Sequence, residues 1–164
     1  MGYAESKHVS ERLLALASEK SSIPTSVCRV GQIAGPIHGT KGMWNKQEWL
    51  PSLVLSSQHL GLVPDSLGTV DMIDWIPVDV LAAIVLELAL GKIAHRAVYH
   101  TVNPKSTTWE ALLPSVQAGL GPDVKTVTLA AWVEALAASA NLSATQEKLA
   151  ANPAVKLLDS MRVW

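Results

Sequence analysis

The fold of this chain is decided by residues 3–36, which read YAESKHVSERLLALASEKSSIPTSVCRVGQIAGP. Apolar side chains such as Val9 and Leu13 recur at helical spacing and predict a helix over residues 3–20. A short turn follows, and residues 25–30 then read as an apolar strand. Because a helix, a short turn and a strand in this order form one step of a βαβ unit, we expect an α/β protein with a parallel sheet.

The remaining sequence continues this alternation of helices and strands. Residues 31–46 and 61–70 are irregular or turn-rich, and the first of these segments is rich in glycine. The helix expected over residues 77–91 is apolar nearly all round, so we expect it to be buried. Further strands are expected at 97–102 and 124–128, and further helices at 47–59, 108–120, 129–140 and 153–161.

Composition excludes several classes of function. The net charge is −1, so the chain offers no basic field for nucleic acid and no polybasic patch for a membrane. Its single cysteine, Cys28, excludes an internal disulfide framework and reads as a core thiol. The longest apolar run, residues 80–89, is too short to span a bilayer. No signal peptide is recognisable, so a cytoplasmic location is expected.

The apolar content of 49% is high for a small soluble domain. This content favours apolar surface that packs against a partner. The five histidines and the single cysteine show no metal-ligand spacing, so no metal site is predicted.

Tyr3 and Lys7 are the first candidate site. Side chains four residues apart on a helix lie on one face, so this phenol and this ammonium can meet at one site. The ammonium favours the phenolate form and makes the phenol a better proton donor near neutral pH. The pattern Tyr-x-x-x-Lys is weak alone, because a chain of this length has roughly one chance in four of containing it by accident. Its alternative is an ordinary pair on a helix surface.

Further motifs in a fixed order make the pattern more specific. They are Tyr3-x-x-x-Lys7, Arg29-x-Gly31-x-Ile33-x-Gly35-Pro36, GMWNKQEWLP at residues 42–51, and Asp74-x-Ile76-Pro77-Val78-Asp79. Together they resemble the second half of an extended short-chain dehydrogenase/reductase. The closest subgroup is the thioester reductase domain (male sterility, NAD-binding type 4) of fungal nonribosomal peptide synthetase-like and polyketide synthase enzymes of secondary metabolism.

The resemblance implies an oxidoreductase in which NADPH reduces a carrier-protein-bound acyl or peptidyl thioester and releases an aldehyde or alcohol. It implies that Tyr3 donates a proton to the developing oxyanion. Lys7 would hold the nicotinamide ribose and tune Tyr3. The main chain of four consecutive residues would pass near the nicotinamide, and these are Val30, Gly31, Gln32 and Ile33.

The resemblance also implies a substrate region. Met43, Trp44 and Trp49 would contact the acyl chain or the phosphopantetheine arm of a carrier protein. Plain hydrophobic packing is at least as good an interpretation of the two tryptophans, because indole rings mostly serve burial.

The fold implied is a partial Rossmann-type parallel sheet without its N-terminal nucleotide-binding half, followed by a smaller and mainly helical substrate region. We expect the first region to cover residues 1–104 and the second to cover residues 105–164. The sequence contains no G-x-G-x-x-G strand-turn-helix, which cradles the pyrophosphate in such folds. The chain alone is therefore expected to bind no nicotinamide cofactor tightly. Expected partners are the carrier-protein thioester or a small-molecule intermediate, and either the missing half or a second copy.

Two alternatives remain open at this point. The chain is either a stand-alone non-redox enzyme, such as a cyclase or an aldol-type catalyst acting on a polyketide or peptide intermediate, or a non-catalytic fragment.

Overall fold

The computed structural model describes residues 2–38, 44–45, 48–91, 97–141 and 151–161. The chain divides into two compact units. The first contains residues 1–42 and 74–104, and the second contains residues 43–73 and 105–164. Packing therefore places residues 43–73 with the C-terminal region, whereas the functional division at residue 104 stays a prediction.

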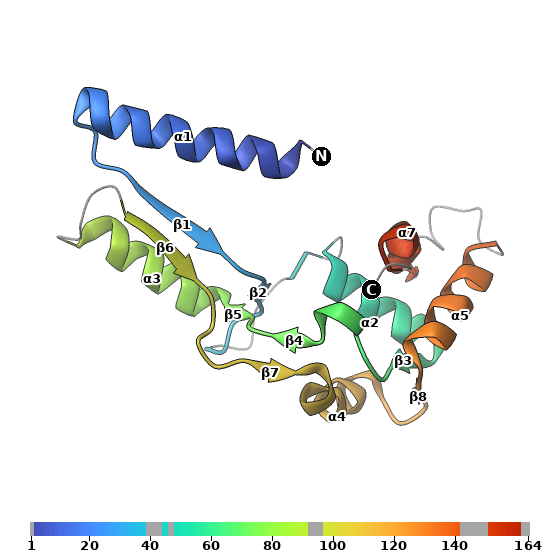
Figure 1. Cartoon of the computed structure of the whole chain (residues 1–164). Helices are drawn as coiled ribbons and strands as arrows, with labels where there is room; N and C mark the ends of the chain where they lie inside the picture. The colour runs from blue at the N-terminus through green and yellow to red at the C-terminus, as the bar shows by residue number, and fades with distance from the viewer. Residues whose placement is uncertain (1, 39–43, 46–47, 92–96, 142–150, 162–164) are drawn as a thin grey trace. The chain divides into compact units, whose positions relative to one another are not determined.

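The first unit is a parallel two-stranded sheet with a helix on either side (Figure 1). In β1 and β6, Ser26 lies opposite Ala97 and Val30 lies opposite Thr101. A second, shorter parallel pair joins β2 to β5. The elements are α1 (Tyr3–Ser21), β1 (Ser26–Val30), β2 (Ile33–Ala34), β5 (Ile76–Pro77), α3 (Val78–Leu90) and β6 (Ala97–Thr101). The predicted helix, strand and parallel pairing are confirmed.

Helix α3 is more exposed than its sequence predicts. Of its residues, all of which the structure describes, only Leu81 is buried. Leu86 is 59% exposed and Leu90 is 83% exposed. The prediction of a buried helix is therefore wrong, because a helix lying on a sheet of two strands contacts protein along one side only. Large apolar side chains are exposed on α1 as well, including Val9 and Leu13.

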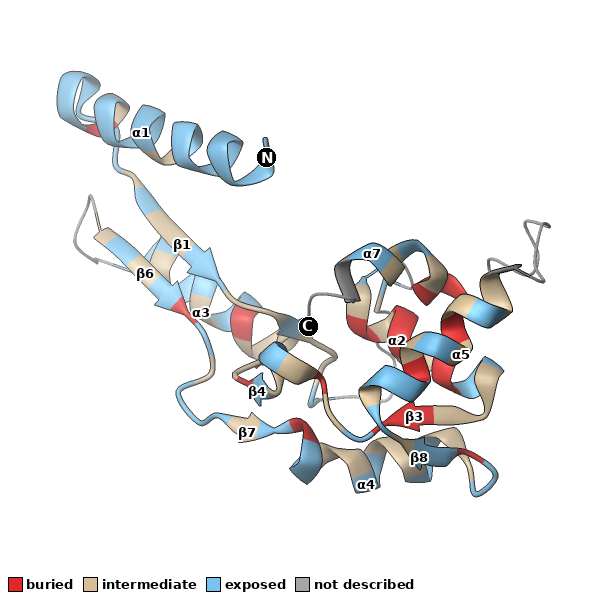
Figure 2. Cartoon of the chain, turned by 45° about the vertical axis from the view of Figure 1, so that its right-hand side comes forward, coloured by how far each residue is buried: buried red, intermediate tan, exposed pale blue. Residues whose placement is uncertain are grey.

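The second unit is mainly helical and contains most of the buried side chains (Figure 2). Its core includes Leu53 of α2, Val63 of β3 and Leu136 of α5, each fully buried. The helices are α2 (Trp49–Leu60), η1 (Gly68–Val70), α4 (Trp109–Leu120), α5 (Leu129–Asn141), η2 (Pro153–Leu157) and α7 (Leu158–Met161), and the strands are β3 (Leu62–Pro64), β4 (Met72–Ile73), β7 (Thr107–Thr108) and β8 (Lys125–Val127).

Strand β3 lies in a segment that the sequence predicts as turn-rich. It pairs in parallel with β8, with Val63 opposite Thr126, whereas β4 pairs antiparallel with β7. The strand forms despite its length of three residues because Val63 and Pro64 are buried. Such a short run carries too little periodicity to be recognised in sequence.

Two buried indoles hold β3 in place through hydrogen bonds to its carbonyl oxygens. Trp109 Nε1 donates to the Pro64 oxygen at 2.8 Å, and Trp132 Nε1 donates to the Leu62 oxygen at 3.0 Å. Trp132 Nε1 also lies 3.1 Å from Ser57 Oγ. Both indoles have no exposed surface, so these bonds satisfy polar groups inside the core.

We expect Trp109→Phe to lower the free energy of unfolding of the chain by about 1–3 kcal/mol, because it removes a buried donor and leaves the Pro64 oxygen without it. Urea unfolding followed by circular dichroism measures this change. The control is Tyr99→Phe, a substitution of an aromatic residue at a half-buried position in β6. Equal destabilisation by the two substitutions would contradict the role given to the Trp109 hydrogen bond.

Candidate functional site

The first two turns of α1 bring the predicted Tyr3 and Lys7 together. Lys7 Nζ lies 5.2 Å from the centroid of the Tyr3 ring. Tyr3 is 77% exposed, so the residue is accessible to a bound molecule. The Glu5 carboxylate caps the start of α1 by accepting a hydrogen bond from the Gly2 N–H. Gly2 has φ +98°, a conformation that favours glycine.

Tyr3 and Lys7 line a cavity of about 530 Å³ that runs between α1 and β1. All of β1, from Ser26 to Val30, lines the same cavity. The structure therefore brings the tyrosine–lysine pair to the same cavity as Val30, the first of the four main-chain residues predicted to pass near the nicotinamide. The other α1 residues lining it are Ser10, Glu11 and Leu14.

Gly31, Gln32 and Ile33 follow at the carboxyl end of β1. The Gly31 N–H points to the Thr101 oxygen at 3.4 Å, and the Gln32 oxygen accepts the Ile76 N–H at 3.0 Å. A Cβ at Gly31 would lie 2.9 Å from Val102 Cγ1, so a side chain there would force Val102 to move. The main chain thus crosses close to β6 and β5, at the edge of the sheet where open α/β folds bind ligands.

Asp79 fixes the loop beyond β2, a role that the sequence analysis missed. Its carboxylate accepts the backbone N–H of His38 at 2.9 Å, of Ile37 at 3.3 Å and of Val80 at 3.1 Å. Partial desolvation raises the pKa of Asp79, but these N–H groups together hold the pKa below its ordinary value of 3.8. The signal available in the sequence is the acidic residue two positions after Pro77, at a helix start.

A second missed contact joins α1 to β1. Arg29 Nε and Nη2 donate to the two carboxylate oxygens of Glu11 at 2.9 Å and 2.7 Å. Arg29 Nη2 and Glu11 Oε2 thus form an ion pair between α1 and β1. The side-chain hydrogen bond from Arg29 lowers the pKa of Glu11, and the same bond raises the pKa of Arg29.

The predicted substrate residues belong to the second unit. Trp44 and Trp49 are both half-buried, and Trp49 is the first residue of α2. The Glu48 N–H donates to the Asn45 oxygen at 3.0 Å and leads into that helix. Met43 lies outside the described residues. The contact of these residues with substrate stays a prediction.

The described part of the chain carries neither a membrane-spanning helix nor a metal-ligand cluster. None of its helices has both the length and the apolar character needed to cross a membrane. The same residues contain no group of three or more histidine, cysteine, aspartate or glutamate side chains that could hold a metal ion.

Comparison with known proteins identifies a family. Residues 1–85 match the family described as male sterility protein, an NAD-binding family. A carboxylic acid reductase from Neurospora crassa is 46% identical over 99% of this chain, and the non-reducing polyketide synthase SAT8 from Stachybotrys chartarum is 38% identical over 96%. The chain spans 16% of the first relative and 6% of the second.

The fold is similar to a solved reductase domain, that of PhqB from Penicillium fellutanum. The TM-score is 0.75 at 18% sequence identity, and the match covers 98% of this chain and 42% of that one. The likeness confirms the predicted α/β class with a Rossmann-type parallel sheet.

Asp79→Asn is expected to lower the thermal midpoint of the chain more at about pH 7 than at about pH 3. The folded pKa of Asp79 lies below its ordinary value of 3.8. The ionised carboxylate therefore stabilises the fold above that value, and its contribution is lost as the pH falls through the folded pKa. Thermal melts across this range measure the difference.

The same substitution at Asp123, an exposed position, is the control for the loss of one charge. A destabilisation by Asp79→Asn that is the same at both pH values would show that the ionised carboxylate does not hold the loop.

Proposed function

Because this chain belongs to the male sterility protein family, we propose that it forms the catalytic and substrate-facing part of an NADPH-dependent reductase. The reductase releases a carrier-protein-bound acyl or peptidyl thioester as an aldehyde or alcohol. The observation that carries the proposal is the pairing of Tyr3 with Lys7 at 5.2 Å, on a cavity that Val30 also lines. The family match and the Neurospora crassa relative support the same reaction class.

In this mechanism Tyr3 is the proton donor. When bound, a nicotinamide cofactor would supply the hydride that reduces the thioester carbonyl carbon. The Tyr3 hydroxyl donates its proton to the carbonyl oxygen as negative charge develops there. Cleavage of the carbon–sulfur bond then gives the aldehyde and the carrier thiol. The exposure of the Tyr3 side chain fits this role, because the reacting oxygen must reach its hydroxyl.

Lys7 has two roles in the proposal. Its ammonium has three donors and no acceptor, which suits the hydroxyl groups of the nicotinamide ribose. Its ammonium also lies 5.2 Å from the centroid of the Tyr3 ring, which places a positive charge beside the proposed proton donor. The main chain from Val30 to Ile33 lies at the carboxyl end of β1 and would border the nicotinamide ring.

The sequence has no G-x-G-x-x-G cradle for the pyrophosphate, so we propose that this chain alone binds NADPH weakly. Trp44 and Trp49 are half-buried and are proposed to contact the phosphopantetheine arm or the acyl chain, with Met43 beside them in sequence. The partner is a phosphopantetheinyl carrier protein of secondary metabolism in the cytoplasm.

Tyr3→Phe is expected to lower kcat for thioester reduction at least ~100-fold and to leave the KM for NADPH within about twofold, because it removes only the donated proton. The assay protein is a chimera in which this chain replaces the matching segment of the Neurospora crassa carboxylic acid reductase. NADPH oxidation with an acyl thioester is measured.

Tyr99→Phe is the matched control, because Tyr99 is the other tyrosine of the chain and lies in β6. It should retain wild-type kcat. Wild-type kcat in Tyr3→Phe would overturn the role of Tyr3, and a wild-type chimera that oxidises no NADPH with any thioester would overturn the proposed function.

A further inference from the structure

We propose that Arg29 is a positioning residue. Through its ion pair with Glu11, it fixes the position of α1 relative to β1 and the rotation of α1 about its own axis, so that Tyr3 and Lys7 face Val30. The inference rests on the proposed function for its catalytic consequence. Its structural part, that this ion pair holds the helix in register, stands on the geometry alone.

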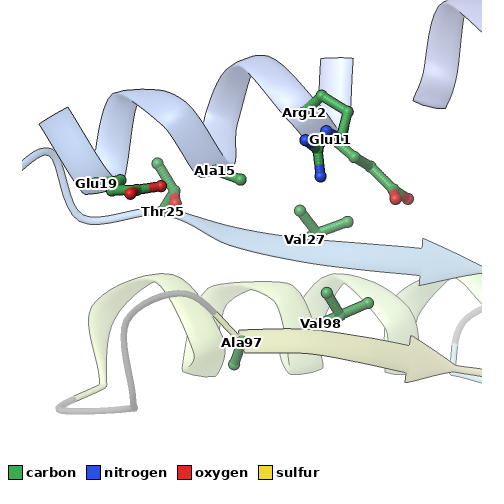
Figure 3. A pocket seen from close by; sticks show the side chains of 8 residues that line it. All are labelled: Glu11, Arg12, Ala15, Glu19, Thr25, Val27, Ala97 and Val98. Carbon is green, nitrogen blue, oxygen red and sulfur yellow. The ribbon is translucent and has the colours of Figure 1, made fainter. Parts of the chain in front are cut away.

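Helix α1 needs such a connection because little else holds it. Of its residues, all of which the structure describes, only Ser18 near the C-terminal end is buried. A second cavity, of about 330 Å³, separates the helix from the strands (Figure 3). Val27 of β1 and Val98 of β6 point toward α1 across this space without filling it. Tight side-chain packing therefore does not fix the helix along its length.

The ion pair crosses the gap between α1 and β1 with a defined geometry. Both carboxylate oxygens of Glu11 are engaged by two different nitrogens of Arg29, at 2.9 Å and 2.7 Å. A bidentate arginine–carboxylate pair fixes orientation as well as distance, because the guanidinium and the carboxylate must be nearly coplanar. A further contact from the strand side, Thr25 Oγ1 to the Leu14 oxygen, is longer at 3.4 Å.

The pair also lies at the right place along both elements. Glu11 follows Lys7 by four residues and Tyr3 by eight, so all three lie on one face of α1. Arg29 immediately precedes Val30 in β1. Glu11, Arg29, Tyr3, Lys7 and Val30 all line the same cavity. A shift of the helix relative to Arg29 therefore becomes a shift of the tyrosine–lysine pair relative to the end of β1.

Because the ion pair is exposed to solvent, it should contribute little to the overall stability of the unit while still positioning α1. The Arg29 side chain is 51% exposed and that of Glu11 is 25% exposed, so solvent and salt screen their attraction. Losing the pair should hardly unfold the unit, yet a small displacement of a catalytic group lowers the rate steeply. The consequence should appear in kcat rather than in the yield of folded protein.

The test compares four variants of the chain within the chimera used for Tyr3→Phe. Arg29→Met is expected to lower kcat about tenfold with the thioester KM within about twofold, because the helix is displaced but the substrate surface is kept. Exchanging the two charges, Glu11→Arg with Arg29→Glu, should restore kcat to within about threefold of wild type. Arg12→Met also removes one positive charge, at the residue next to Glu11 in α1, and should leave kcat unchanged.

The fourth variant combines Arg29→Met with Tyr3→Phe. In the Tyr3→Phe background, Arg29→Met should lower kcat less than about twofold, because its effect is transmitted through Tyr3.

Hydrogen exchange of the chain alone supplies a readout that needs no activity. Backbone amides of residues 3–14 should exchange faster in Arg29→Met than in wild type or Arg12→Met, and the charge exchange should restore protection. Unchanged exchange in Arg29→Met overturns the inference, whether or not the chimera is active. The inference is also overturned if Arg29→Met lowers kcat by the same factor in the Tyr3→Phe background as it does in the wild type. An inactive wild-type chimera instead overturns the proposed function and leaves the exchange result to decide the role of the ion pair.

Discussion

The parallel pairing of β1 with β6 is the constraint on which the first unit depends. It joins strands about 70 residues apart in the chain and sets Val30 beside Thr101. The pairing extends one residue past β1, because the Gly31 N–H points to the Thr101 oxygen. Beyond β6, the Asn103 N–H donates to the oxygen of Asp74, which precedes β5. The main chain proposed to border the nicotinamide ring is therefore backbone that this pairing holds in place.

The two units are stabilised in different ways. The second unit buries large apolar side chains and ties β3 to its helices through the indoles of Trp109 and Trp132. The first unit buries little of α1 or α3, and polar contacts organise its loops and its first helix. The Asp79 carboxylate accepts hydrogen bonds from the N–H groups of Ile37 and His38, and the Arg29 guanidinium donates to the Glu11 carboxylate. The candidate site thus lies on a unit in which directional polar contacts, rather than close packing, set positions.

The sequence predicts the parts of this structure that are encoded by local periodicity. The helix at 3–20, the strand at 25–30 and the strand at 97–102 all appear, since their apolar spacing is clear over five residues or more. The pairing of Tyr3 with Lys7 follows from the same helical geometry. Contacts between distant residues are different. Glu11 and Arg29 are 18 residues apart, and His38 and Asp79 are 41 apart, so no periodic pattern marks them. Burial of α3 was predicted wrongly because composition reports how apolar a helix is and not how many neighbours it has.

The close approach of Gly31 to Val102 links two positions that lie far apart in the chain. A Cβ at position 31 would lie 2.9 Å from the Val102 Cγ1 methyl and would overlap with it. The combined size of the side chains at positions 31 and 102 is therefore limited. A smaller residue at 102 would leave room for a side chain at 31, whereas with valine at 102 a side chain at 31 requires Val102 to move. Related sequences should therefore vary at these positions as a pair, and the size of one residue should report the size permitted to the other.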